Sequence, residues 1–399
     1  MKYVDEFRDG DLARILAGRI ARAVESRRRY RFMEFCGGHT HAISRYGVTD
    51  LLPASIEMVH GPGCPVCVLP IGRIDNAIAL ALEHGAILCT YADTMRVPAS
   101  ERSSLAKAKA AGADIRMVYS AADALRIARD DPAREVVFFA IGFETTTPPT
   151  AIAILEADRA GLANFSVFCN HVVTPAAIAN ILESPQVRDI GTVPLDGFVG
   201  PAHVSCVIGS QPYEYFAAEY AKPVVIAGFE PLDVMQAVLM LVEQANDGRH
   251  EVENEFSRAV TRAGNAKAKA LVAEVFELRR SFEWRGLGEV PYSALRIKTR
   301  YERFDAEKRF GIAYRPVADN KACECGAILR GAKRPKDCKV FGTVCTPENP
   351  IGSCMVSSEG ACAAYYTYGR FRDLQRATEV TENTERTEKG KRAAGGVIA

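Results

Sequence analysis

Residues 135–151 read EVVFFAIGFETTTPPTA and contain the clearest strand-to-helix pattern of the chain. A short β-rich run, Glu135–Ile141, is followed by a glycine, a polar stretch and a helical pattern over Thr150–Ala160. The same alternation of short strands and longer helices extends from Tyr30 to about Gln244. Strands that alternate with helices of this length are typical of βαβ units, so the sequence predicts an α/β fold with parallel sheets.

On both sides of this stretch, the same pattern predicts eight strands in all and a series of helices. The strands are expected at Tyr30–Phe35, Ile56–His60, Ala86–Tyr91, Ile115–Tyr119, Glu135–Ile141, Ser166–Cys169, Gly197–Val199 and Pro223–Ala227. The helices are expected at residues 11–28, Ile71–His84, Ser100–Ala111, Ala121–Arg129, Thr150–Ala160, Pro175–Leu182, Tyr213–Tyr220, Pro231–Gln244 and about Val252–Arg280.

The chain is expected to divide into four parts. An Asp-Asp-Pro turn near Asp130–Arg134 interrupts the pattern, and we place the boundary between two Rossmann-like lobes there. Lobe I would cover residues 1–130 and lobe II residues 131–250, with the two lobes facing a cleft. Residues 251–371 would form a helical linker and a Cys-rich domain. Residues 372–399 contain six basic and five acidic residues and no aromatic residue, which predicts a disordered tail.

The composition is ordinary for a globular protein, with 48% hydrophobic and 25% charged residues among 399. Fifty Lys and Arg against 49 Asp and Glu leave a net charge of +1, which gives no electrostatic case for binding nucleic acid or an anionic membrane. No apolar stretch approaches the roughly 20 residues of a membrane helix. The first residues, MKYVDEFRDG, contain no apolar signal segment. We therefore expect a cytoplasmic location.

Reactive residues gather at the ends of the predicted strands. In open parallel sheets, ligands bind outside the carboxyl ends of the strands, where the loops converge. These ends include FCGGHTH (35–41), HGPGCPVC (60–67), IGFETTTPP (141–149) and VGPAHVS (199–205). Five of the seven histidines, among them His39 and His203, lie at such ends. Several loops that carry Cys, His, Glu and Thr at one end of a sheet favour a shared site over separate structural roles.

Three of these loops carry chemistry of their own. Cys36 opens a predicted helix, whose N–H groups can lower the pKa of its thiol, and this suits a nucleophile or a metal ligand better than a buried core residue. Cys64 and Cys67 form a C-x-x-C motif, for which we favour a reversible dithiol over half of a zinc site. Glu144 precedes three threonines, and either a functional role or a helix-capping network accounts for this group.

Six of the twelve cysteines fall between Cys323 and Cys362, with the spacing C-x-C-x12-C-x6-C-x8-C-x7-C. In a reducing compartment such density indicates metal binding or redox chemistry. A structural zinc site would use four thiolates and leave two unexplained. A [4Fe–4S] cluster also uses four and leaves two that can form a redox disulfide beside it, so we favour iron–sulfur. The spacing does not identify which four would be the ligands.

Several motifs together resemble one known family. CGGHTHAISRYG (36–47), GPGCPVCVLP (61–70), GFETTTPPTA (142–151), GPAHVS (200–205) and the six-cysteine segment are similar to the hydrogenase maturation factors of the HypD family. The resemblance extends from about residue 5 to residue 372. It implies two similar α/β domains facing a cleft and a third domain that carries a [4Fe–4S] cluster.

The resemblance also implies roles for the cysteines and a set of partners. Its cluster environment is like that of ferredoxin:thioredoxin reductase, which implies ligation by Cys323, Cys338, Cys345 and Cys362, and a redox disulfide between Cys325 and Cys354. The family binds the chaperone HypC, and the two hold the iron that becomes the Fe(CN)2CO unit of [NiFe]-hydrogenase. HypE, carrying a cyanide group made with HypF, delivers the cyanide ligands. The essential cleft cysteines of the family match Cys36, Cys64 and Cys67.

From these residues we expect a redox-active assembly scaffold. Cys36 would bind the iron together with a cysteine of the partner, assisted by His39 or His203, because thiolate and imidazole suit iron that carries CN and CO. Cys64 and Cys67 would manage the redox state, and Glu144 would hydrogen-bond the diatomic ligands or contribute to docking. The alternatives are a stand-alone iron–sulfur disulfide reductase and a zinc-stabilised binding module.

Overall fold

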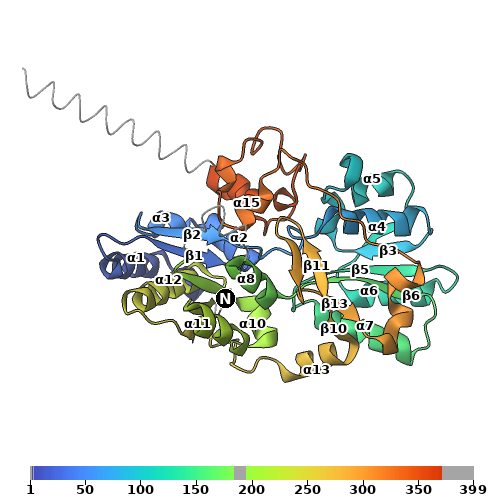
Figure 1. The fold of residues 1–399 in the computed structure, drawn as a ribbon, viewed down its shortest axis with the longest axis horizontal. Coiled ribbons are helices and arrows are strands. Elements are labelled where there is room, and N and C mark those ends of the chain that lie inside the picture. Colours follow the sequence, from blue (N-terminus) through green and yellow to red (C-terminus); the bar gives the residue numbers. More distant parts are fainter. Residues whose placement is uncertain (1, 3, 184–194, 371–399) are drawn as a thin grey trace, which may run out of the picture.

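The computed structural model describes residues 2, 4–183 and 195–370, and it contains two parallel α/β lobes and a C-terminal cysteine segment (Figure 1). The predicted fold class is therefore confirmed. The tail expected at residues 372–399 lies outside the described residues. In the described ranges, no helix combines the length and apolar character that a membrane crossing requires.

The first lobe, here called the five-stranded lobe, is a parallel sheet with strand order β2-β1-β7-β8-β9. Its strands are β1 (Tyr30–Glu34), β2 (Ile56–His60), β7 (Gly197–Pro201), β8 (Val224–Ala227) and β9 (Val252–Asn254). Helices cover both faces, and each face has its own buried apolar cluster. These helices are α1 (Gly10–Ala23), α2 (Gly37–Tyr46), α3 (Val48–Leu51), α8 (Thr174–Glu183), α10 (Ala202–Ile208), α11 (Glu214–Tyr220) and α12 (Pro231–Asn246).

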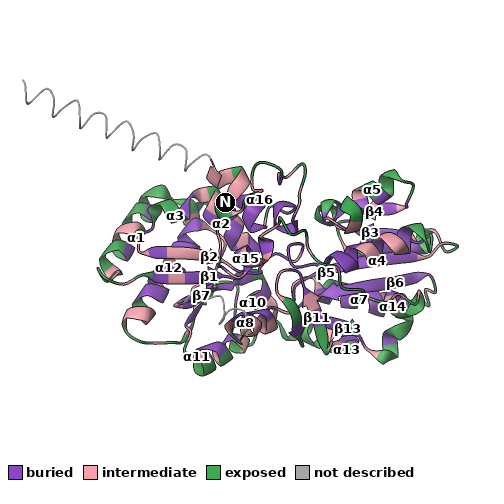
Figure 2. Cartoon of the chain, turned by 45° about the horizontal axis from the view of Figure 1, so that its top comes forward, coloured by how far each residue is buried: buried purple, intermediate pink, exposed green. Residues whose placement is uncertain are grey.

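The second lobe, the four-stranded lobe, has the parallel order β4-β3-β5-β6. Its strands are β3 (Ile87–Thr90), β4 (Ile115–Met117), β5 (Val136–Gly142) and β6 (Phe165–His171). Its helices are α4 (Ile71–Leu82), α5 (Leu105–Ala110), α6 (Ala121–Asp130) and α7 (Thr147–Arg159). All seven residues of β5 are buried, because neighbouring strands and helices on both faces cover this apolar run. Figure 2 shows β5 and β6 in the buried colour, with exposed residues on the outer helices.

The two sheets do not divide at Asp130–Arg134, and this expectation is corrected. Strand β5 follows that turn but pairs with β3, while β7 returns to pair with β1. Between β1 and β9 the chain therefore crosses between the lobes twice, after β2 and after β6. The alternation of strands and helices in the sequence predicts the individual elements, but it does not predict which strands hydrogen-bond to one another. The pairing of β7 with β1 was missed for this reason.

The expected helix over Val252–Arg280 is also corrected. Its first residues form the edge strand β9, and the helix that follows, α13, covers Ala266–Val275. Two short antiparallel pairs come next, β10 (Phe276–Leu278) with β13 (Leu295–Ile297), and β11 (Ser281–Trp284) with β12 (Gly288–Pro291).

The C-terminal cysteine segment, residues 323–362, contains little regular structure. Its helices are short, α15 (Cys325–Leu329) and α16 (Ala361–Ala364), and α14 (Ala306–Arg309) precedes it. The segment lies over the junction of the lobes (Figure 1). It shares an apolar cluster with the four-stranded lobe, and α16 packs against α2 of the five-stranded lobe. The cysteines are thereby held against both lobes.

Candidate functional site

Cys36 follows β1 and is the N-cap residue of α2. Its backbone N–H donates to Glu34 Oε2 at 3.0 Å. Burial is the main cause that raises the pKa of its thiol, and the nearby carboxylates of Glu359 and Glu34 raise it further. Backbone N–H groups of Gly38 and His203 lower it by a smaller amount. The prediction that helix N–H groups would lower the pKa of this thiol is therefore wrong in its net direction, because burial prevails.

The contact between Cys36 and His203 joins two of the predicted loops. His203 lies in α10, directly after β7, and its ring centroid is 4.1 Å from that of Phe229. The ring of His39 is 5.1 Å from the same phenylalanine. Burial lowers the pKa of His203, and the charge of His39 lowers it further. The carboxyl ends of β1, β7 and β8 therefore bring Cys36, His39 and His203 to one place, as the strand-end argument predicts.

Only one of the two ring nitrogens of His39 is hydrogen-bonded among the described residues. Its Nε2 lies 3.0 Å from the carbonyl oxygen of Ala227 and 2.9 Å from that of Gly228, so Nε2–H is the donor to this pair. Nδ1 is buried and has no hydrogen-bond partner among the described residues. Burial lowers the pKa of His39, which keeps the ring neutral. The Nδ1 lone pair is thus available, in the manner of a histidine whose other nitrogen is fixed by a carbonyl for metal binding.

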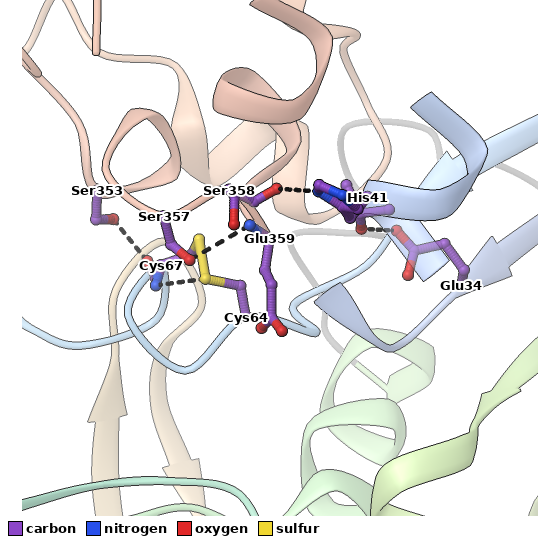
Figure 3. Close-up of a disulfide and its surroundings, with 9 residues drawn as sticks. Glu34, His41, Cys64, Cys67, Ser353, Ser357, Ser358 and Glu359 are labelled. Atoms are coloured by element: carbon purple, nitrogen blue, oxygen red, sulfur yellow. Dashed lines mark hydrogen bonds between the residues drawn. A yellow bond between two sulfur atoms is a disulfide. The ribbon is translucent and has the colours of Figure 1, made fainter. Parts of the chain in front are cut away.

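Cys64 and Cys67 form a buried disulfide with a Cα–Cα distance of 5.2 Å (Figure 3). The turn that carries them packs directly on the Cys36 segment, since Gly37 N–H donates to Gly63 O at 3.0 Å. The C-terminal cysteine segment covers the disulfide. Ser353 Oγ donates to Cys67 O at 2.7 Å, and a Cβ at Gly360 would lie 3.0 Å from Cys67 Sγ. That this disulfide is reversible stays a prediction.

The Glu144 side chain is hydrogen-bonded to the start of α8, the segment at which the chain returns to the five-stranded lobe. Its two carboxylate oxygens accept from Thr174 N at 2.8 Å and from Thr174 Oγ1 at 2.9 Å, at the start of α8. Burial raises the pKa of Glu144 to about 7. The hydroxyls of Thr146 and Thr147 both donate to Phe143 O at 3.2 Å. Hydrogen bonds within the chain therefore occupy the Glu144 carboxylate and these hydroxyls, although Thr146, the N-cap residue of α7, makes no side-chain capping hydrogen bond. A role of Glu144 toward diatomic ligands stays a prediction.

Sequence reasoning missed several residues of this site. Glu34, the last residue of β1, is buried and hydrogen-bonded to Cys36, and its position in a buried strand was the available signal. Phe229 separates the two histidine rings and gave no signal of its own. Glu359 lies close to Gly37, where a Cβ would be 2.6 Å from its Oε2, and burial raises the pKa of Glu359. Only the folded chain brings residue 359 to residue 37.

The C-terminal thiols contact one another. Cys325 forms thiol hydrogen bonds with Cys323 and with Cys362, and these contacts raise the pKa of both partners. Cys354 and Cys345 lie within electrostatic reach of this group. Ile351 N–H donates to Cys345 Sγ at 3.4 Å. Cys338 is different, because its interactions are with Glu324 and Lys333.

These thiols offer the soft donors that an iron–sulfur group would need. A Cβ at Gly352 would lie 2.3 Å from Cys323 Sγ and 2.6 Å from Cys325 Sγ, so the missing side chain leaves room for sulfur. Among the described residues, no three His, Cys, Asp or Glu side chains are grouped to hold one metal ion. A four-iron cluster holds its four thiolates further apart than one ion does, and soft sulfur donors suit it.

Comparisons with known proteins place the chain in a family. The family described as "Hydrogenase formation hypA family", HypD, matches residues 11–369. A relative from Cupriavidus necator named hydrogenase maturation factor HypD is 73% identical over 374 residues, which cover 94% of this chain and 99% of the relative. A relative of the same name from Rhizobium leguminosarum bv. viciae is 69% identical, and the alignment covers 95% of this chain and 98% of the relative. Another from Escherichia coli K12 is 45% identical, and the alignment covers 92% of this chain and 98% of the relative. With a family match over most of its length and relatives aligned from end to end, the chain belongs to the HypD family of hydrogenase maturation factors.

Proposed function

We propose that this chain is the cytoplasmic scaffold on which the Fe(CN)2CO unit of [NiFe]-hydrogenase is assembled. The iron is the cargo of the scaffold. It is held jointly with the chaperone HypC and accepts cyanide ligands from HypE, which HypF supplies. The observation that carries this proposal is the unpartnered Nδ1 of His39, three residues after the buried thiol of Cys36 at the start of one helix. Cys36 is the N-cap residue of α2 and His39 is its third residue, so both donors lie at the first turn of one helix and could act on one ion.

The charges around Cys36 support a divalent cargo. Burial raises the pKa of the Cys36 thiol, and the carboxylates of Glu359 and Glu34 raise it further, so the thiol stays protonated in the free protein. The same negative charges attract a divalent cation, since opposite charges attract strongly where water is excluded. The thiol would lose its proton as it bonds to iron. His39 stays neutral and keeps its Nδ1 lone pair, with His203 as the second imidazole of the site.

The disulfide at Cys64 and Cys67 would set the redox state of this site. The C-terminal segment that covers it would hold a resident [4Fe–4S] cluster, which supplies single electrons when bound. We propose as ligands Cys323, Cys338, Cys345 and Cys362, with Cys325 and Cys354 as a redox pair. The contacts of Ser353 and Gly360 with Cys67 support exchange between the two centres, because they place the cysteine segment on the disulfide.

A direct test replaces Cys36 by alanine in the complete chain, purified without oxygen together with HypC. We expect the infrared bands of iron-bound CN and CO to disappear. Cys206→Ala is the matched control, because Cys206 is a free, half-buried thiol on α10 outside the donor set. Bands of equal strength in the Cys36→Ala and Cys206→Ala proteins would rule out Cys36 as an indispensable iron ligand.

A stand-alone disulfide reductase is the second candidate. The close approach of Gly360 to both Cys354 O and Cys67 Sγ favours it, because a disulfide covered by a cysteine-rich segment is also the arrangement that a reductase needs. Sustained turnover of a dithiol protein in the absence of HypC would select this function. A single reduction of Cys64–Cys67 without turnover would select the scaffold.

A further inference from the structure

We propose that Glu34 is a positioning residue that fixes two sulfur-bearing segments against each other, the start of α2 with Cys36 and the turn with Cys64 and Cys67. Glu34 ends β1, the strand that pairs with both β2 and β7. Its side chain is fully buried. A buried carboxylate is costly unless it is hydrogen-bonded, so its partners identify the segments that it stabilises.

One set of partners lies on α2. Glu34 Oε2 accepts the backbone N–H of Cys36 at 3.0 Å. Glu34 Oε1 accepts from the hydroxyl of Thr40, one turn further along the same helix. Both bonds involve a carboxylate and are therefore stronger than bonds between neutral groups. They hold the first turn of α2, and with it the backbone of Cys36, on the end of β1.

The other set of partners leads into the disulfide turn. Glu34 Oε1 also accepts from Nδ1 of His60 at 2.9 Å, and the main-chain oxygen of Glu34 accepts from Gly61 N at 2.9 Å. His60 is the last residue of β2, and the chain runs from it through Gly61 and Gly63 to Cys64. His60 also lines a cavity of about 610 Å³.

Close backbone packing makes the two segments move together. A Cβ at Gly63 would lie 2.4 Å from Cys36 N and 2.6 Å from the carbonyl carbon of Phe35, so these segments leave no space between them. A shift of the Cys36 backbone would therefore displace the turn that carries Cys64. One carboxylate that bonds to both segments keeps the thiol and the disulfide in a fixed relation. That this arrangement serves iron binding rests on the proposed function. The contacts themselves do not depend on it.

The test measures both sulfur segments in the complete chain with the Cys64–Cys67 disulfide intact. Alkylation of Cys36 by iodoacetamide is followed by peptide mass spectrometry, and reduction of the disulfide by a phosphine is followed in parallel. We expect Glu34→Ala to raise both rates about tenfold or more, because buried charged hydrogen bonds are lost from both segments. Thr40→Val should raise mainly the alkylation rate, and His60→Ala mainly the reduction rate.

Two variants separate positioning from general stability. Glu34→Gln keeps the shape and can still bond to both segments, so both rates should stay within about threefold of the original. Asn164→Ala removes a buried amide that donates to three carbonyl oxygens in the four-stranded lobe, and it should leave both rates unchanged. Equal rises in Asn164→Ala and Glu34→Ala would overturn the proposal. If Glu34→Ala does not fold, unchanged rates in both Thr40→Val and His60→Ala would overturn it.

A second readout uses cobalt(II) alone and the part of its near-ultraviolet thiolate absorption band that a Cys36→Ala protein lacks, because the C-terminal thiols can also bind cobalt. If the original protein and Glu34→Gln give the band while Glu34→Ala gives it with at least about tenfold weaker affinity, positioning by Glu34 extends to the metal site. An equal affinity in Glu34→Ala would contradict that extension. Absence of the band in the original protein would count against Cys36 as a metal ligand, while the alkylation and reduction rates would still decide the role of Glu34.

Discussion

The cysteines at the junction of the lobes and those of the C-terminal segment are held in different ways. Cys36, Cys64 and Cys67 lie on loops at the ends of parallel strands, where hydrogen bonds to Glu34 and backbone packing fix them. The C-terminal cysteines lie in a segment with short helices, and their thiols mainly contact one another. The first group is organised by the fold. The second would be organised by the group that it binds, since metal binding supplies folding free energy to such segments.

The largest expected effect is the loss of iron from the C-terminal segment. Serine in place of a cluster ligand should remove almost all iron and acid-labile sulfide from protein purified without oxygen, because four thiolates are needed. Iron content and absorbance near 400 nm provide the measurement. Loss is expected at Cys323, Cys338, Cys345 and Cys362, and retention at Cys325 and Cys354. Zinc in place of iron in the unmodified protein would contradict the assignment and support a zinc-stabilised module.

Two glycines allow a matched test of intermediate size. Gly63→Ala would place a methyl group 2.4 Å from the backbone nitrogen of Cys36, whereas Gly352→Ala would place one 2.3 Å from Cys323 Sγ. Overpacking against rigid backbone should destabilise the five-stranded lobe by about 1–3 kcal/mol. Gly352→Ala should leave the thermal midpoint of the lobes unchanged and lower the iron content. A lower midpoint for Gly352→Ala with normal iron would break the distinction.

The third expected effect concerns pH and the junction of the lobes. Burial raises the pKa of Glu144 from 4.5 to about 7, so the folded chain binds more protons than the unfolded chain between these values. The contribution of Glu144 to stability is therefore complete below pH 4.5 and declines as the pH rises through 7, by about 3 kcal/mol. Glu144→Gln should remove this decline. Unfolding by urea between pH 4.5 and 8 measures it, and identical slopes for both proteins would contradict the shift.

The sequence predicts the elements and the gathering of strand ends well, for a physical reason. Strands, helices and turns follow from local patterns, and the carboxyl ends of parallel strands meet wherever the strands pair. This is why Cys36, His39 and His203 could be expected at one edge of the sheet. The strand pairing itself is a long-range property, so the return of β7 to β1 and the true division of the lobes could not be derived.

Contacts that join distant parts of the chain were equally hidden. Glu359 approaches Gly37 only because the C-terminal segment folds back over α2. The direction of the pKa shift at Cys36 depends on burial and on that carboxylate, so the helix start alone gave the wrong sign. Cys338 illustrates a further limit, since cysteine spacing cannot reveal its interactions with Glu324 and Lys333.

Backbone hydrogen exchange before and after iron removal measures whether the fold or the bound cofactor organises each group of cysteines. The complete chain would be purified without oxygen, and its amide protection would be mapped by mass spectrometry. We predict that removing iron lowers protection across residues 323–362 by about a hundredfold or more, while residues 34–46 and 56–67 keep theirs. Equal loss at the junction of the lobes, or unchanged protection in the cysteine segment, would contradict a fold-organised site beside a segment that its bound cofactor organises.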